Sequence, residues 1–232
     1  MKNNQVFDNT AKQIKSTTEI LKSASLVIYE NPLRKIIDKK VQQITWNNNA
    51  HGREVSSKAF LTIDQYLKIL STNSYQLLLS DYSIIRYSFV FDGAHLTQQN
   101  LLWWPCPVKM DSDIEDMFGD MVTGIKDTIN AANNQSDYVM RSPIRVDYDS
   151  QNDTADHPKA HLHVSHPECR INTNAPICFN RFVKFIILNF YPDYARLCED
   201  LDFLTYQYGN SETSTIYNNP TRVLFKCTSS IS

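Results

Sequence analysis

The segment from residue 75 to residue 104 constrains the fold most, because it reads as three β-strands separated by tight turns. Ser80-Asp81 divides the first two strands, and Asp92-Gly93 before the third is a hairpin signal. In the middle strand, residues 84–91, alternate side chains are apolar and share one face. These alternate residues are Ile85, Tyr87, Phe89 and Phe91. Connections this short join antiparallel neighbours, so we expect an antiparallel sheet.

Helical segments flank the expected strands, which predicts an α+β fold: an antiparallel sheet of about five to six strands packed against helices. The expected strands span residues 75–79, 84–91, 101–104, 143–149, 160–165 and 221–225. The expected helices span residues 9–29, a short stretch that starts at Asn31-Pro32, 56–71, 111–132, 179–191 and 194–204. We divide the chain at an Asn-rich loop into an N-terminal helical region, residues 1–52, and an α+β core, residues 53–232, which together make one compact unit.

Composition excludes several classes of protein. A chain of 232 residues with 42% hydrophobic side chains can bury a large core, so it is neither disordered nor dependent on disulfides. The net charge of -2 excludes a globally basic nucleic-acid binder. The five cysteines form no CxxC pair, and the N-terminus carries no apolar signal segment. The richest apolar stretch, residues 182–191, is far shorter than the ~20 residues that span a bilayer. We therefore expect a cytoplasmic protein with no membrane contact.

Charge is unevenly distributed along the chain. Residues 1–58 carry ten Lys or Arg and five Asp or Glu, whereas residues 110–160 carry four and eleven. One interpretation is simply two solvated faces. The other is a basic N-terminal surface that meets nucleic acid or an acidic partner.

Histidine is concentrated in one short segment. Four of the six histidines fall between residues 157 and 166. Alternate side chains of a strand share a face, so His161 and His163 project together. By the same rule the preceding strand places three polar side chains on one face: Arg145, Asp147 and Asp149. If the two strands are neighbours, all five side chains gather on one polar face of the sheet.

Three interpretations of this polar face compete. His161, His163 and Asp147 have the chemistry of ligands for a divalent metal such as Zn, Mn or Mg. Without a metal, the two imidazoles can act as general base and acid while Arg145 stabilises a phosphorane-like charge, as in a metal-independent ribonuclease. The third interpretation is a solvated face whose histidines bind the neighbouring carboxylates.

Two of the remaining histidines and three other residues are weaker candidates. His157 lies in the preceding loop and can join the site, whereas His166 has the opposite parity. Trp104, beside Trp103, could stack on a nucleobase or seal a core. Arg170 could contact a nucleic-acid phosphate or form an ordinary salt bridge. Cys169 has no catalytic context. The sequence has no Walker loop, GxGxxG or GxSxG motif, which argues against P-loop, Rossmann and α/β-hydrolase enzymes.

Several runs resemble a bacterial family of unknown function, domain-of-unknown-function family number 2290. They are residues 73–89, 102–107, 145–149, 157–163 and 182–191. The resemblance covers roughly residues 10–205, and the family implies no settled activity. A looser resemblance, over residues 75–166, is to small TumE-like toxins, in which a hairpin precedes a strand with His-x-His. That resemblance implies a toxin–antitoxin or defence setting and a nuclease activity.

These observations give two hypotheses of function. The first is a component of a bacterial toxin–antitoxin or anti-phage system that cleaves RNA or DNA. In it His161 and His163 are catalytic or bind a metal, Asp147 and Asp149 orient them or share the metal, and Arg145 holds phosphate. The alternative is a non-enzymatic subunit of a defence complex with structural histidines. Its basic N-terminus and tryptophans would bind a protein partner encoded nearby.

Overall fold

The computed structural model describes residues 5–38, 41–46, 62–110, 120–154, 157–166, 169–173, 175–204 and 224–225. Within these residues ten strands form one sheet. They are β1 (Val27–Glu30), β2 (Arg34–Asp38), β3 (Val41–Thr45), β4 (Leu77–Leu79), β5 (Ile84–Asp92), β6 (His95–Trp104), β7 (Ile144–Asp149), β8 (Ala160–Val164), β9 (Ile171–Thr173) and β10 (Leu224–Phe225). The expected α+β class with an antiparallel sheet is confirmed, and the sheet is larger than expected.

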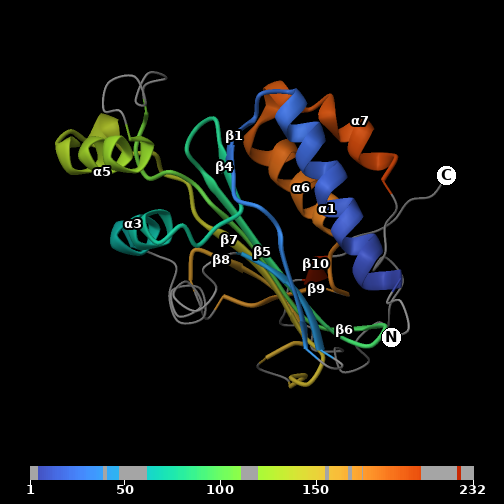
Figure 1. The fold of residues 1–232 in the computed structure, drawn as a ribbon. Helices are drawn as coiled ribbons and strands as arrows, with labels where there is room; N and C mark the ends of the chain where they lie inside the picture. The colour runs from blue at the N-terminus through green and yellow to red at the C-terminus, as the bar shows by residue number, and fades with distance from the viewer. Residues whose placement is uncertain are drawn as a thin grey trace.

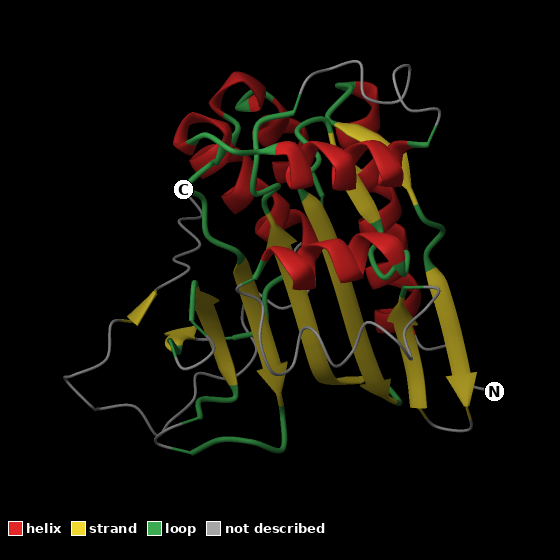
Figure 2. Ribbon diagram, turned by 90° about the vertical axis from the view of Figure 1, so that its left-hand side faces the viewer, coloured by secondary structure: helices red, strands yellow, loops and turns green. Residues whose placement is uncertain are grey.

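The strand order is β1-β4-β5-β6-β7-β8-β9-β10, with the β2–β3 hairpin attached to β5 through β3. Strands β4 and β3 pair with opposite ends of the long strand β5, which is therefore central. All pairings are antiparallel except that of β10 with β9. Figure 2 shows the strands side by side in a single layer.

Helices lie on both faces of this sheet. The helices are α1 (Gln5–Ser23), α3 (Ile63–Ser71), α5 (Met121–Ala131), α6 (Phe179–Phe190) and α7 (Leu197–Asp202), and two 3-10 turns are η1 (Gln135–Asp137) and η2 (Pro192–Tyr194). Helices α1, α6 and α7 pack together on one side, while α3 and α5 lie on the other side near one end of the strands (Figure 1). No helix among the described residues is long and apolar enough to cross a membrane.

The larger core fills the space between the sheet and the α1/α6/α7 layer. Helix α1 buries one stripe of side chains at helical spacing there, including Phe7, Ala11 and Ile14. Alternate residues of β5, β6, β7 and β8 face the same core: Tyr87, Phe89, Phe91, Leu101, Trp103, Val146 and Leu162. A smaller core packs α3 and α5 against the other face, where it contains Leu102 and Trp104.

The N-terminal region differs most from expectation. The helix predicted over 9–29 ends at Ser23, and Ile28 belongs to β1. The predicted helix at Asn31-Pro32 is wrong, because β2 and β3 follow as a hairpin that pairs with β5. The Asn31 side chain donates to Asn73 Oδ1 and to the Tyr75 carbonyl, so it ties the end of β1 to the segment between α3 and β4 instead of capping a helix. Residues 1–52 thus contain one described helix and three strands, and the proposed division at residue 52 lies outside the described residues.

The remaining elements agree with the sequence in type. The helices expected over 56–71 and 111–132 appear as α3 and α5, and residues 56–61 and 111–119 lie outside the described part. The 194–204 helix is shorter, as η2 and α7. Of the final strand, expected over 221–225, residues 224–225 form β10, and residues 221–223 lie outside the described part. The short strand β9 was not expected, because three residues carry too little pattern to distinguish a strand from a loop.

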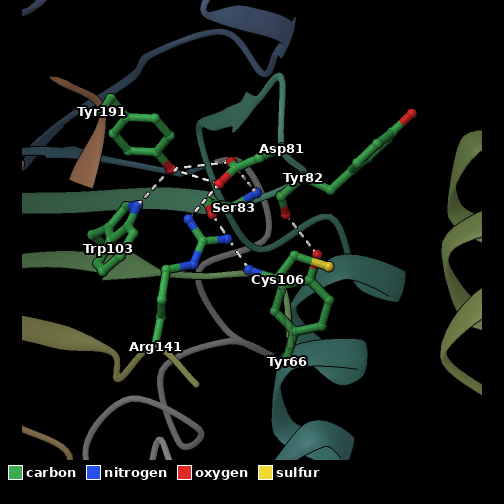
Figure 3. A network of polar contacts seen from close by, with 8 residues as sticks. All are labelled: Tyr66, Asp81, Tyr82, Ser83, Trp103, Cys106, Arg141 and Tyr191. Atoms are coloured by element: carbon green, nitrogen blue, oxygen red, sulfur yellow. Dashed lines mark hydrogen bonds and ion pairs between the residues drawn. The ribbon is translucent and has the colours of Figure 1, made fainter. Parts of the chain in front are cut away.

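A polar network fixes the turn between β4 and β5 to the helical layer (Figure 3). The Asp81 carboxylate accepts hydrogen bonds from Arg141 Nη1 at 2.7 Å and from the Tyr191 hydroxyl at 3.0 Å. Trp103 Nε1 donates to the same hydroxyl at 3.2 Å. On the other side of the turn, the Tyr66 hydroxyl donates to the Tyr82 carbonyl at 2.6 Å. The tight turn predicted at Ser80-Asp81 is therefore the point where α3, α6 and the sheet are joined.

Candidate functional site

Strand register places the predicted polar residues in two rows across one face of the sheet. One row contains Ser88, Asn100, Asp147, His161 and Asn172, which are paired residue by residue from β5 to β9. The next row contains Arg86, Leu102, Arg145 and His163. The antiparallel pairing of β7 with β8 therefore brings Arg145, Asp147, His161 and His163 together, as the alternation in the sequence predicted.

Asp147 is the centre of this group. Its Oδ2 accepts from Arg145 Nε at 2.7 Å and lies 3.2 Å from His163 Nε2, and its Oδ1 accepts from Asn100 Nδ2 at 2.6 Å. Burial alone would raise the pKa of Asp147. The hydrogen bond from His163 and the charges of Arg145 and the histidines outweigh burial and lower that pKa to about 2. Asp147 is therefore an anion at neutral pH.

His161 is a buried, neutral imidazole with a defined tautomer. Its Nδ1 lies 2.6 Å from the Pro158 carbonyl oxygen, and because a carbonyl only accepts, Nδ1 carries the proton. The lone pair is then on Nε2, which makes no hydrogen bond with any described residue and lies 3.9 Å from Asp147 Oδ2. Burial lowers the pKa of His161 to about 4, and the neighbouring His163 and His157 act in the same direction against the opposing charge of Asp147.

His163 is as deeply buried as His161, with 1% of its surface exposed. Its Nε2 is 2.9 Å from Arg145 Nη2 and 3.2 Å from Asp147 Oδ2. One tautomer accepts from the guanidinium and the other donates to the carboxylate, so no neutral form satisfies both contacts. This nitrogen therefore faces a donor and an acceptor at once.

Three of these side chains form a potential metal centre. One ligand atom each from Asp147, His161 and His163 lies within 4.8 Å of the other two. Two neutral imidazoles and one carboxylate are a donor set that zinc, iron and manganese accept, and such three-ligand sites leave positions for water or substrate. The Nδ1–H bond of His161 to a backbone carbonyl is the orienting contact usual for a metal-bound histidine.

A cavity of about 320 Å³ opens beside this cluster. Its wall includes Arg145, Asp147, His157 and His161, and the His157 and His161 rings lie 4.7 Å apart. Side-chain amides and Trp46 line the remainder: Gln43, Gln98, Gln99, Asn100 and Asn152. Buried polar atoms that lack hydrogen-bond partners in the structure, Asn100 Oδ1, His157 Nδ1 and His161 Nε2, belong to this wall. Such atoms concentrated at one place indicate a site built for water, an ion or a ligand.

Asp149, predicted as a second catalytic carboxylate, lies at the cavity but outside the cluster. Its Oδ1 accepts from the backbone of Gln151 at 3.0 Å, and its Oδ2 accepts from the Asn152 side chain at 2.9 Å. The strand ends at this residue, and the carboxylate organises the turn that follows. The structure therefore gives Asp149 a local structural role and places Asp147 alone with the histidines.

The predicted nucleic-acid contacts of Trp104 and Arg170 are not part of the site. Trp104 is 4% exposed and packs against Tyr66, with ring centres 6.4 Å apart, so no face is open for a nucleobase. Trp103 is fully buried as well, which removes the tryptophan surface of the partner-binding hypothesis. Arg170 precedes β9, half-buried and outside the cavity wall. His166 lies exposed after β8, away from the cluster.

Sequence reasoning missed Arg86, which is fully buried in the row of Arg145. Its guanidinium lies 4.5 Å from the centre of the Trp46 ring, a cation–π contact. Burial, together with the charge of Arg145, lowers the pKa of Arg86 to about 9 against the opposing effect of Asp147. An arginine amid the apolar residues of β5 was the signal in the sequence, since buried arginines are rare without a specific role.

Fold and site together define an α+β protein whose sheet is apolar on one face and carries a buried His-His-Asp cluster on the other. The chain belongs to the family described as uncharacterized conserved protein (DUF2290), whose model matches residues 26–225. The family resemblance expected from the sequence is thereby confirmed. No curated protein and no solved structure matches the chain, and no comparison supports the resemblance to TumE-like toxins.

Proposed function

We propose that this protein is a metal-dependent phosphodiesterase whose centre is Asp147, His161 and His163. The observation that carries the proposal is the convergence of their three ligand atoms within 4.8 Å of one another, with Asp147 and His161 in the wall of a cavity. A divalent metal in such a site lowers the pKa of bound water and polarises a phosphoryl oxygen. Imidazole ligands favour Zn or Mn over Mg, so we expect one of the first two.

The hydrogen bonds favour a metal ligand over a general base at His161. Pro158 fixes the proton on Nδ1, and the Nε2 lone pair is buried without a hydrogen bond. A metal would use this lone pair directly. A proton-relay mechanism would instead require the buried imidazole to gain a charge, and burial opposes this by lowering the pKa of His161 to about 4.

The neighbouring charges support an anionic substrate. Arg86 and Arg145 flank Leu102 in one row of the sheet, and Asp147 is the carboxylate that faces them. With a divalent ion bound, the cluster would have a clear positive excess, and guanidinium groups match the geometry of phosphate oxygens. A cavity of about 320 Å³ is at the lower end of the range for small-molecule sites, so one nucleotide unit is the size of substrate that we expect there.

We further propose that this activity serves a bacterial toxin–antitoxin or anti-phage system in the cytoplasm, with RNA or DNA as substrate and a protein partner encoded nearby. This setting comes from the looser resemblance to TumE-like toxins and not from the geometry of the site. Expression of the wild-type chain and of a His161→Ala variant in a bacterial host tests it: the wild type should impair growth or block phage, and the variant should not.

Elemental analysis of the purified protein tests the metal centre directly. We expect about one equivalent of Zn or Mn in the wild type and none in a His161→Ala, His163→Ala double variant. His166→Ala is the matched control, because it removes an exposed histidine of the same segment. Cleavage of single-stranded RNA and DNA should follow metal content across the three proteins. Full cleavage by the double variant would refute the proposal.

A further inference from the structure

Building on the proposed function, we infer that Arg145 competes with the metal for its ligands, and that its displacement couples metal binding to the binding of a phosphodiester anion. Arg145 is 5% exposed and is in direct contact with two members of the cluster, Asp147 and His163. Its role would be regulatory as well as substrate-binding: metal and anion would each promote the binding of the other.

The contacts of Arg145 carry the first step. Its Nε lies 2.7 Å from Asp147 Oδ2, and its Nη2 lies 2.9 Å from His163 Nε2. These two contacts are with two of the three potential metal ligands, Asp147 and His163. A guanidinium and a divalent cation cannot both sit within hydrogen-bond distance of them, because like charges so close repel strongly in a buried site. Metal binding therefore requires Arg145 to move.

The cavity supplies the place to which Arg145 can move. Arg145 and Asp147 both line it, so the guanidinium can rotate toward it without crossing the core. Arg86 lies in the same row, on the far side of β6. Strands are ~4.8 Å apart, so the two Cα atoms lie roughly 10 Å from each other. Arg86 is fully buried against the Trp46 ring, which lines the cavity, so it adds a second positive charge behind the cavity wall. A displaced Arg145 without an anion would leave the two guanidiniums and the metal in mutual repulsion.

Linkage then sets a reciprocal effect. An anion that binds the displaced Arg145 in the cavity, near the charge of Arg86, stabilises the metal-bound arrangement. By thermodynamic necessity the metal then strengthens anion binding by the same factor. An arginine that merely positions Asp147 for the metal would behave in the opposite way, since its removal would weaken metal binding. The sign of the effect of an Arg145 substitution therefore separates the two roles.

Titration calorimetry of the metal-free full chain with Mn²⁺, with and without dimethyl phosphate, tests the inference. Dimethyl phosphate is a soluble phosphodiester, and we choose it because it does not withdraw free Mn²⁺ from the solution. For the wild type we expect the anion to tighten Mn²⁺ binding about 5-fold or more. For Arg145→Met we expect tighter Mn²⁺ binding than in the wild type without the anion, and no further effect of dimethyl phosphate. Arg145→Gln, which keeps a hydrogen bond to Asp147 without the charge, should behave in the same way.

Each result decides a different claim. Weaker Mn²⁺ binding by folded Arg145→Met and Arg145→Gln, or a phosphodiester effect that persists in them, would overturn the competition while leaving the metal centre intact. Absence of Mn²⁺ and Zn²⁺ binding in the wild type and in both variants would overturn the metal centre and the inference together. Circular dichroism of each variant establishes that it is folded before the comparison is made.

Discussion

The two faces of strands β5 to β8 are made from alternate residues of the same segments, yet they are built on different principles. One face buries apolar side chains such as Phe89 and Leu162 against α1 and α6. The other buries charged and polar side chains, among them Arg86, Arg145 and His161. Burial of apolar surface stabilises the fold, whereas burial of charged and polar groups is costly unless they are paired.

This difference teaches where function is located in the sheet. A protein could satisfy the second face with ordinary polar residues open to water, as in many antiparallel sheets. Here two guanidiniums and two imidazoles are withdrawn from solvent beside a partly buried carboxylate instead, and perturbed groups of this kind are typical of functional sites. The apolar face should therefore control the free energy of unfolding, and the polar face should control the binding of metal and anion. Neighbouring residues with opposite orientations allow each claim to be tested.

The largest effect on stability should come from Phe89→Ala. Phe89 is fully buried in the larger core, and loss of a buried aromatic ring costs about 3–5 kcal/mol of unfolding free energy through lost burial and a residual cavity. Ser88→Ala is the matched control, because Ser88 precedes Phe89 and lies on the polar face at the cavity. Urea denaturation of both variants measures the difference. Equal destabilisation by the two substitutions would contradict the division between the faces.

The adjacent pair Leu162 and His161 separates stability from binding. Leu162→Ala should lower the unfolding free energy by about 2–4 kcal/mol and leave metal content unchanged, because the side chain packs in the larger core. His161→Ala should abolish metal binding and cost less stability than Leu162→Ala: it loses the hydrogen bond of Nδ1 to the Pro158 carbonyl, but it also removes the buried Nε2, which has no hydrogen bond within the described residues. Denaturation and elemental analysis on the same preparations measure both quantities. A His161→Ala protein that retains stoichiometric metal would contradict the claim that the polar face controls metal binding.

The sequence was sufficient to predict which side chains of a strand share a face of the sheet. It was not sufficient to predict which residues of neighbouring strands pair with one another. Alternation with a period of two put His161 and His163 on one side and Leu162 on the other, because that pattern needs only the backbone geometry of a strand. It could not show that Asn100 and Asn172 share a row with Asp147, since strand order and register depend on long-range pairing. The sequence reasoning also failed at Asn31-Pro32, where a local capping signal was overridden by pairing of the hairpin with β5.

An intermediate effect is expected for Asp147→Asn in the metal-free protein. The folded-state pKa of Asp147, about 2, lies below the ordinary aspartate value, so the ionised carboxylate stabilises the fold at neutral pH. Linkage converts a shift of this size to about 2 kcal/mol. Because the folded pKa is the lower one, this stabilisation is complete above the unfolded-state pKa near 4 and is lost as the pH falls toward 2. The difference in unfolding free energy between wild type and Asp147→Asn should therefore be largest at pH 7 and shrink below pH 4. A difference that is independent of pH would show that Asp147 stabilises the fold by some other means.

The smallest effect should come from Asp149→Asn, which tests whether the cavity needs a second carboxylate. Asp149 accepts from the Gln151 backbone and the Asn152 side chain, and an asparagine oxygen can still accept from one of them. We expect a loss of less than about 1 kcal/mol in stability, the scale of a single hydrogen bond at a partly exposed turn. Metal affinity should stay within a few-fold of the wild type, because the Asp149 carboxylate is not among the clustered ligand atoms. Calorimetric titration with Mn²⁺ measures this, with Asp147→Asn as the positive control. A loss of metal binding in Asp149→Asn as large as that in Asp147→Asn would place both carboxylates at the metal centre. The polar site would then extend to the end of β7.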